Sequence, residues 1–218
     1  MAIVFHPEPF TAGNVKRRKT METKTVNVYQ FDELEERVQD KIISEWEIND
    51  WYADNILDYW KARLTSIGFI EPEINYSGFW SQGDGASFTC KWIDFSLLIS
   101  SMIYCYGYYP PMLDKALYFA EVGYIHGGIN RTSYHYSHKN TVSLSLEMDI
   151  YQDVKGVWER LESDLYDSIQ EYSKDLMREI YHDLEKEYED VSSREYIMEE
   201  IDNLELLFYK NGRIFNDN

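Results

Sequence analysis

The strongest constraint on the fold is a run of apolar residues near the C-terminus, spaced three or four residues apart. This spacing places its members on one side of an α-helix, which must be buried against other elements because isolated helices gain little stability in water. The pattern predicts one helix of about 37 residues, or two helices broken near Tyr172-Ser173. The apolar members are Val154, Trp158, Leu161, Leu165, Ile169, Tyr172, Leu176, Ile180, Leu184 and Tyr188.

Two further helices are predicted before residue 68. Asp32 is a suitable N-cap for the first helix, with Glu35 as its capping-box partner. After a break at Asn49-Asp50, a second helix runs to Ile67, and Gly68 can adopt the left-handed conformation that ends it. The buried stripe of the first helix comprises Leu34, Val38, Ile42 and Trp46.

Residues 69–150 carry strand and turn signals instead. Alternating residues from Ile74 to Trp92 predict a hairpin with Asp84-Gly85 as its turn. A helical turn is expected at 113–119. Strands are expected at 118–126, 131–137 and 141–149, with turns at Gly127-Gly128 and Lys139-Asn140.

The two ends complete the expected domain. Thr25 to Phe31 predicts a short strand, Ser192 opens a last helix, and Asn211-Gly212 predicts a type I′ turn in a terminal hairpin. The fold class is therefore α+β: an antiparallel β-meander packed with N-terminal helices and a long C-terminal helical segment ending in a hairpin. We expect a single domain over 25–218, with helices at 32–67, a β-rich part at 69–150 and helical structure at 152–209.

Charge is distributed unevenly along this acidic chain. Its 39 Asp and Glu against 21 Lys and Arg give a net charge of −18. Residues 1–24 have a net charge of +3 and are expected to be a flexible basic extension, with Met21 as an alternative start, whereas residues 151–218 have a net charge of −11. So negative a domain is not expected to bind nucleic acid or an anionic membrane directly.

Two cysteines, Cys90 and Cys105, are too few for a disulfide scaffold and indicate a reducing compartment. We find no apolar run long enough to span a membrane and no apolar region typical of a secretory signal. The expected location is the cytoplasm.

The segment from Phe79 to Ala86 is the first candidate site. Trp80 offers a flat ring, and Gln82 and Asp84 offer polar groups beside two glycines. The segment is not a dinucleotide-binding fingerprint, because a third glycine and a following helix are missing. The simpler interpretation is a tight hairpin turn.

Tyrosines and carboxylates form the second set of candidate contacts. Tyr106, Tyr108 and Tyr109 precede Pro110-Pro111, and tyrosine is enriched at protein–protein interfaces. Carboxylates on the long helix either form a solvated face or substitute for DNA phosphates in a partner's basic cleft. The carboxylates concerned are Glu185, Glu187, Glu189 and Asp190.

Three histidines, His126, His135 and His138, form a weaker metal-binding alternative. On a strand, His135 and His138 would point to opposite faces, so they would not hold one metal together without a bulge. No residue spacing selects the third and fourth ligands that zinc prefers. We therefore expect no metal site and no cofactor.

Several segments together carry a resemblance to a known group. These are the SGFWSQGDGA box at 77–86, Tyr136 to Asn140, and the IYHDLEKEYE segment at 180–189, framed by Phe31 to Leu34 and by Asn211-Gly212. Over roughly residues 25–215 the chain resembles a poorly characterised family of tailed-phage and prophage proteins, from which residues 1–24 depart. The resemblance implies a product made in an infected bacterial cytoplasm.

The function we expect is that of a non-enzymatic, phage-encoded accessory protein. It would bind and inhibit a host bacterial protein, for example a defence nuclease system, and self-association into a homodimer stays open. The alternative is a small-ligand- or metal-binding enzyme that uses the glycine-rich box and the three histidines.

Overall fold

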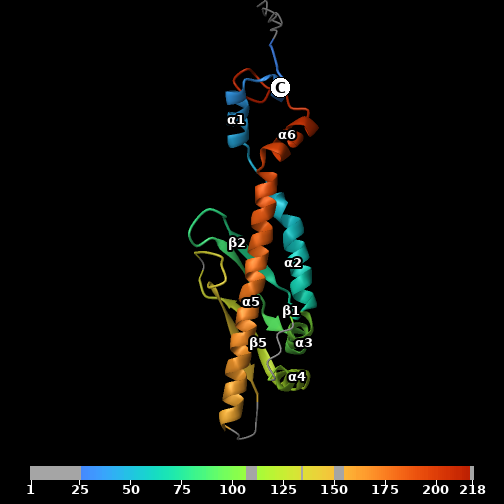
Figure 1. Cartoon of the computed structure of the whole chain (residues 1–218), viewed down its shortest axis with the longest axis vertical. Coiled ribbons are helices and arrows are strands. Elements are labelled where there is room, and N and C mark those ends of the chain that lie inside the picture. The colour runs from blue at the N-terminus through green and yellow to red at the C-terminus, as the bar shows by residue number, and fades with distance from the viewer. Residues whose placement is uncertain (1–25, 107–111, 134, 150–154, 217–218) are drawn as a thin grey trace, which may run out of the picture.

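One unbroken helix, α5, organises the molecule. The computed structural model describes residues 26–106, 112–133, 135–149 and 155–216. In it, α5 (Lys155–Val191) has 37 residues, which confirms the single-helix prediction. At 1.5 Å per residue it is roughly 55 Å long, and it runs along most of the elongated molecule (Figure 1). Its buried residues follow the predicted stripe: Leu161, Leu165, Ile169, Tyr172, Leu176, Ile180 and Leu184.

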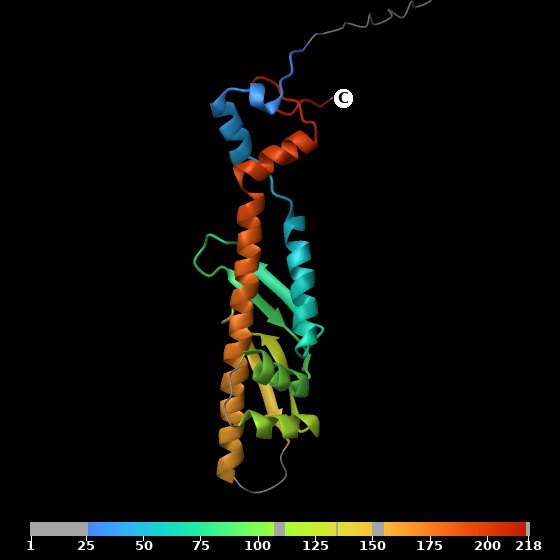
Figure 2. The ribbon, with the colours of Figure 1, turned by 45° about the vertical axis from the view of Figure 1, so that its right-hand side comes forward.

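Helix α2 (Asp54–Ser66) lies beside α5 (Figure 2). Its buried Trp60 donates an indole N–H bond of 2.9 Å to the Asp183 carboxylate on α5. Arg63 stacks 4.6 Å from the Trp60 ring and lies 3.5 Å from Glu179. Gly68 follows α2 with φ +108°, as its predicted role at the helix end requires.

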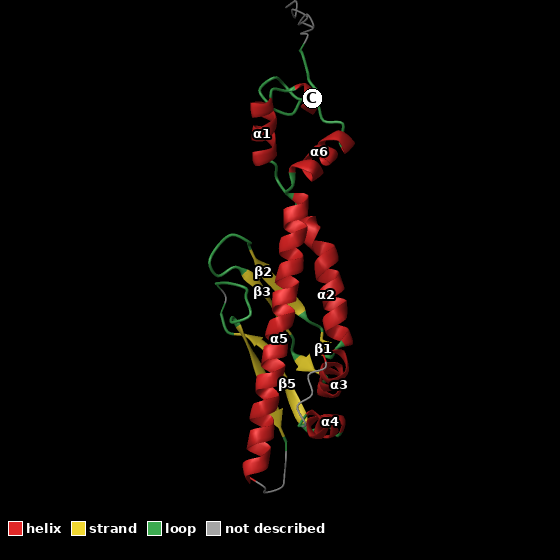
Figure 3. Ribbon diagram, viewed as in Figure 1, coloured by secondary structure: helices red, strands yellow, loops and turns green. Residues whose placement is uncertain are grey.

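Three antiparallel strand pairs complete the α+β fold, which confirms the predicted fold class (Figure 3). Strand β1 (Phe69–Ile70) pairs with β4 (Trp92–Ile93), β2 (Glu73–Ser77) with β3 (Gly85–Thr89), and β5 (Ile125–Arg131) with β6 (Val142–Met148). A bridge between Cys90 and Ile129 joins the second pair to the third. Helices α3 (Phe95–Tyr106) and α4 (Leu113–Glu121) pack on each other and on the same core, and α4 confirms the helical turn expected there.

The predicted two-residue turn at Asp84-Gly85 is wrong. Gly85 already pairs with Ser77 inside the β2–β3 ladder, so residues 78–84 form a longer loop. The reason is local, because the Asp84 side chain bonds back to the loop backbone, as described below.

The strands predicted at 118–126 and 131–137 are also wrong over most of their length, because α4 continues to Glu121 and residues 132–133 and 135–141 form no strand. Their residues Ile125, His126 and Arg131 belong to β5. Gly127-Gly128 is not a turn but lies within β5. A Cβ on Gly128 would lie 2.6 Å from the carbonyl oxygen of Cys90, so glycine permits close strand approach here. The last predicted strand, 141–149, and the Lys139-Asn140 turn are confirmed.

A second, smaller hydrophobic cluster lies at one end of the molecule. It is built from η1 (Phe31–Glu33), α1 (Glu36–Ser44), α6 (Arg194–Asn203) and the chain after α6. We call residues 26–49 and 192–216 the cap, and residues 50–191 the body, which includes η2 (Asp50–Ala53). The buried members of the cap cluster are Phe31, Leu34, Ile42, Ile197, Ile201 and Phe208.

Three expectations for the cap need correction. Asp32 is not an N-cap: it lies inside η1, where the Glu33 carboxylate accepts a bond from Gln30 N–H (2.9 Å), and α1 begins only at Glu36. Residues 26–31 form no regular strand, although Tyr29 bridges Phe208. The N-cap residue of α6 is Ser193 rather than Ser192, and the Ser193 side chain accepts a hydrogen bond from Tyr196 N–H.

The terminal hairpin is present but has a different turn. Tyr209 N–H donates to Arg213 across a three-residue loop in which Gly212 has φ +86°. A type I′ turn would require positive φ at Asn211 as well, and Asn211 does not have it. Among the described residues, no helix has both the length and the apolar character that crossing a membrane requires.

Candidate functional site

The loop at 78–84 is held in shape by one carboxylate. Asp84 Oδ2 accepts backbone N–H bonds from Trp80 (2.9 Å) and Ser81 (2.6 Å). Its own N–H donates to the Ser81 carbonyl (3.0 Å), and Gly83 has φ +107°. Asp84, predicted as a partner contact, is therefore a positioning residue that orients the Trp80 backbone.

An aromatic cluster anchors this loop to α5. The Phe79 ring lies 5.0 Å from Tyr188 and 5.6 Å from Tyr181, both on α5, and 6.1 Å from Tyr76 on β2. Trp80 meets Tyr188 edge-on at 6.4 Å, yet its side chain is 75% exposed. Trp80 thus has a fixed backbone, a supporting ring and a large free surface.

Two tyrosine hydroxyls of this cluster are perturbed. The Tyr52 hydroxyl donates to that of Tyr76 at 3.3 Å, and burial together with this bond raises the pKa of Tyr52 well above its ordinary value. Burial, followed by the charges of Glu185 and Asp84, also raises the pKa of Tyr181. Both hydroxyls stay protonated at neutral pH and act as hydrogen-bonding groups rather than as bases.

Four carboxylates predicted as contacts lie close to Tyr188 along α5. Glu185 and Glu187 are partly buried and Glu189 and Asp190 are exposed, all on the last two turns of α5 that include Tyr188. We call Trp80, Tyr188 and these four carboxylates the acidic aromatic surface. The loop and this end of α5, about a hundred positions apart in the chain, therefore meet through the contacts of Phe79 and Trp80 with Tyr188.

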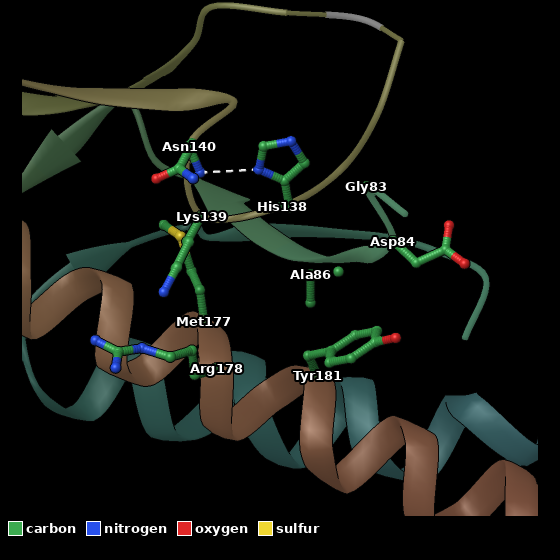
Figure 4. A pocket seen from close by; sticks show the side chains of 10 residues that line it. Gly83, Asp84, Ala86, His138, Lys139, Asn140, Met177, Arg178 and Tyr181 are labelled. Atoms are coloured by element: carbon green, nitrogen blue, oxygen red, sulfur yellow. Dashed lines mark hydrogen bonds between the residues drawn. The ribbon is translucent and has the colours of Figure 1, made fainter. Parts of the chain in front are cut away.

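A cavity of about 330 Å³ lies between β3, the 138–140 turn and α5. His138 and Asp84 both line it, but the Asp84 carboxylate points away from the imidazole (Figure 4). His138 Nδ1 accepts from Asn140 N–H at 3.1 Å. Arg178, also in the lining, is paired with Glu171 (2.8 Å) and with Asp175. His138 Nδ1, the Asp84 carboxylate and Arg178 are engaged in structural bonds, and His138 and Asp84 do not form an acid–base pair.

Comparison with known proteins adds one finding. A family model described as a domain of unknown function, DUF8835, matches residues 51–194. The chain belongs to the DUF8835 family. The match spans the body almost from end to end, including the long helix and the 78–84 loop, and leaves nearly all of the cap outside. No curated protein and no solved structure matches the chain.

The three histidines do not meet in this DUF8835 domain. His126 Nε2 lies 3.5 Å from the Asp149 carboxylate, and the His135 ring lies beside Tyr136. Over the described parts of the chain, no three His, Cys, Asp or Glu side chains gather as metal ligands. Burial raises the pKa of the Cys90 thiol to about 11, so this cysteine is an inert core residue.

Other expected contacts lie elsewhere or outside the described residues. Gln82 is exposed in the same loop as Trp80. Tyr106 is the last residue of α3, whereas Tyr108 and Tyr109 lie outside the described residues. Sequence reasoning missed Phe79 and Tyr188 as supports of Trp80, because Tyr188 follows the apolar spacing of the core stripe.

Proposed function

We propose that this DUF8835 protein is a non-enzymatic binding protein that docks a basic host protein on its acidic aromatic surface. The observation that carries the proposal is Trp80: three-quarters exposed, set against Tyr188, and fixed at its backbone by Asp84. Exposed tryptophans on pre-ordered supports are typical binding hot spots, because little conformational freedom remains to be lost on binding.

The resemblance to tailed-phage proteins supports the setting of this proposal. In that setting the protein acts in the infected bacterial cytoplasm and inhibits a host defence or regulatory protein, such as a nuclease system. The four carboxylates near Tyr188 on α5 favour a partner with a basic face, and they accelerate association at low ionic strength.

DNA mimicry is a narrower version of the same proposal. It requires carboxylates on α5 that stay free to meet a basic cleft. Mid-helix, Glu171 and Asp175 are already paired with Arg178 and are less free for this role, so the carboxylates at the last turns of α5 are the ones we test. Binding would then weaken steeply with salt.

The test compares two equally exposed tryptophans. Trp80 and Trp51 are both 75% exposed, and only Trp80 belongs to the acidic aromatic surface. After affinity capture from bacterial lysate identifies a partner, titration calorimetry is run with Trp80→Ala and Trp51→Ala. A hot-spot loss of about 2 kcal/mol raises the Kd roughly thirtyfold for Trp80→Ala, whereas Trp51→Ala stays within about twofold.

Two further variants separate positioning from contact. Asp84→Ala frees the loop and is expected to weaken binding while the fold is retained. Glu185→Lys with Glu189→Lys is expected to weaken binding at low salt, with a smaller effect at high salt. Equal affinities of the Trp80→Ala and Trp51→Ala proteins would contradict the proposal, and insensitivity to the double charge reversal would eliminate mimicry.

Small-ligand binding is the second candidate, favoured by the cavity that His138 and Asp84 line. Its volume of about 330 Å³ is at the lower end of the range for small-molecule sites. A thermal-shift screen of nucleotides and divalent metals tests it, since a ligand that binds only the folded state raises the unfolding temperature. A shift of several degrees that His138→Ala abolishes would favour this function.

A further inference from the structure

A lysine without a partner lines the cavity between β3, the 138–140 turn and α5. Lys139 lies in that turn and is partly buried, and within the described residues its ammonium group has no hydrogen-bond or ion-pair partner. Lysine side chains are mostly exposed unless they are paired, because taking an ammonium out of water without compensation costs free energy. A partly buried, unpaired ammonium at a cavity therefore favours an anion as the occupant.

Arg178 on α5 supplies a second cation. Figure 4 shows the Arg178 guanidinium at the same end of the cavity as the Lys139 ammonium, on the opposite wall. Arg178 Nη2 is paired with Glu171 and Asp175, and Nε donates to the Lys174 carbonyl at 3.3 Å. These bonds hold the guanidinium in one direction, and in the described part of the chain they leave Nη1 without a partner. Arginine N–H groups form strong, charge-assisted bonds to carboxylates and phosphates, so Nη1 is a suitable donor to an anion.

The neighbouring carboxylates leave this end of the cavity open. Glu171 and Asp175 do not line the cavity, and their side chains are 63% and 49% exposed, so water and salt screen their charges. Asp84 is the one acidic residue among the described lining residues, and its carboxylate lies at the other end, bonded to the loop backbone (Figure 4). In a chain of net charge −18, the lining thus carries two cations and one carboxylate.

The remaining wall of the cavity is largely apolar. Ala86 on β3 and Met177 on α5 are 2% and 1% exposed, and Tyr181 on α5 adds an aromatic side chain. Methionine adapts its shape to a ligand and makes favourable contacts with aromatic rings. The volume of about 330 Å³ has room for about ten non-hydrogen atoms at roughly 30 Å³ each. A ligand with one small ring and one anionic group therefore matches both the apolar and the cationic parts of the lining.

We infer that this cavity binds a small organic anion whose carboxylate or phosphate lies between Lys139 and Arg178. The apolar ring of this ligand packs against Met177 and Tyr181. The inference rests on the second candidate function, small-ligand binding, and names the class of ligand. It does not depend on a protein partner at the acidic aromatic surface.

Titration calorimetry of the full chain with four single-ring probes tests the inference. Phenyl phosphate and phenylacetate are anions, benzyl alcohol is uncharged and benzylamine is a cation. We expect at least one of the two anions to bind with a Kd below about 1 mM, and the other two probes to bind at least about tenfold more weakly. Lys139→Gln should raise the Kd of the anion by about tenfold or more, whereas Lys139→Arg, which keeps the charge, should stay within about threefold.

The matched control is Lys115→Gln on α4, an exposed lysine outside the cavity lining, which should leave the Kd of the anion unchanged. Circular dichroism checks that each variant is folded. Binding of benzyl alcohol or benzylamine without binding of either anion would overturn the inference and leave small-ligand binding standing. An anion affinity that Lys139→Gln does not change would also overturn it. So would the absence of binding by all four probes up to about 10 mM, a result that does not touch docking through Trp80.

Discussion

Gly128→Ala is the sharpest test of how the two hairpins are joined. Gly128 lies in β5 opposite Ser145, and the next residue, Ile129, bridges Cys90 through bonds of 2.9 and 3.1 Å. A Cβ on Gly128 would lie 2.6 Å from the carbonyl oxygens of both Cys90 and Lys91, where ordinary contacts begin at 3.4 Å. Because both oxygens belong to the backbone, no side-chain rotation relieves the overlap.

The expected cost follows from these contacts. Overpacking of this kind costs about 1–3 kcal/mol, and a widened bridge loses part of two hydrogen bonds worth about 1 kcal/mol each. The lower chain entropy of alanine in the unfolded state offsets about 0.4–1 kcal/mol. We expect a net loss of about 2 kcal/mol, which in a protein of this size lowers Tm by roughly 4–8 °C.

Urea unfolding followed by circular dichroism measures this loss, with Gly123→Ala as the control. Gly123 has φ +77° and no atom within 4 Å of the place that a Cβ would occupy, so alanine there is strained only in its backbone. That strain costs about 1 kcal/mol. If Gly128→Ala destabilises the protein no more than Gly123→Ala does, the close approach of β5 to the Cys90-Lys91 backbone is refuted.

Two further predictions concern buried and capping polar groups. Asp183→Ala leaves the buried Trp60 indole N–H without its acceptor and should lower the free energy of unfolding by about 2 kcal/mol. A double-mutant cycle with Trp60→Phe tests this, because additive losses of stability would argue against the hydrogen bond. Asp94→Ala should cost about 1 kcal/mol at pH 7 because Asp94 caps α3. The Leu97 N–H lowers the pKa of Asp94, so its stabilisation is present above the unfolded pKa of about 4 and is lost as pH falls through the lower folded value. The difference in the free energy of unfolding between wild type and Asp94→Ala, measured by urea titration, should therefore decrease from pH 7 to pH 3. A difference that stays constant would contradict this role.

Helices were predictable where one repeated spacing extended over many residues. The stripe from Leu161 to Leu184 matches the buried face of α5, and Gly68 ends α2 as expected. Capping was less predictable, because Asp32 and Glu35 satisfy the capping-box pattern but the chain forms a 3₁₀ turn whose capping box, Gln30 with Glu33, lies two residues earlier. The Gln30–Glu33 bonds and the predicted Asp32–Glu35 bonds are local alternatives of the same kind. The burial of Phe31 in the cap cluster favours the first.

The strands and the site depend on contacts that sequence spacing does not contain. Gly127-Gly128 has the composition of a turn, but backbone contacts explain both glycines inside β5: Gly127 faces the Ser145 backbone of β6, and Gly128 faces the Cys90-Lys91 backbone of another hairpin. Trp80 could be selected as a candidate contact from its loop. Its support by Tyr188 could not, because that contact joins residues more than a hundred positions apart.

The division into two hydrophobic clusters has a consequence for how such chains diversify. The chain leaves the first part of the cap into η2 and returns to the cap after α5, and the family match, residues 51–194, stops close to both crossings. Because the cap buries its own hydrophobic cluster, we expect substitutions within that cluster to leave the core of the body, the part that the family model matches, largely undisturbed.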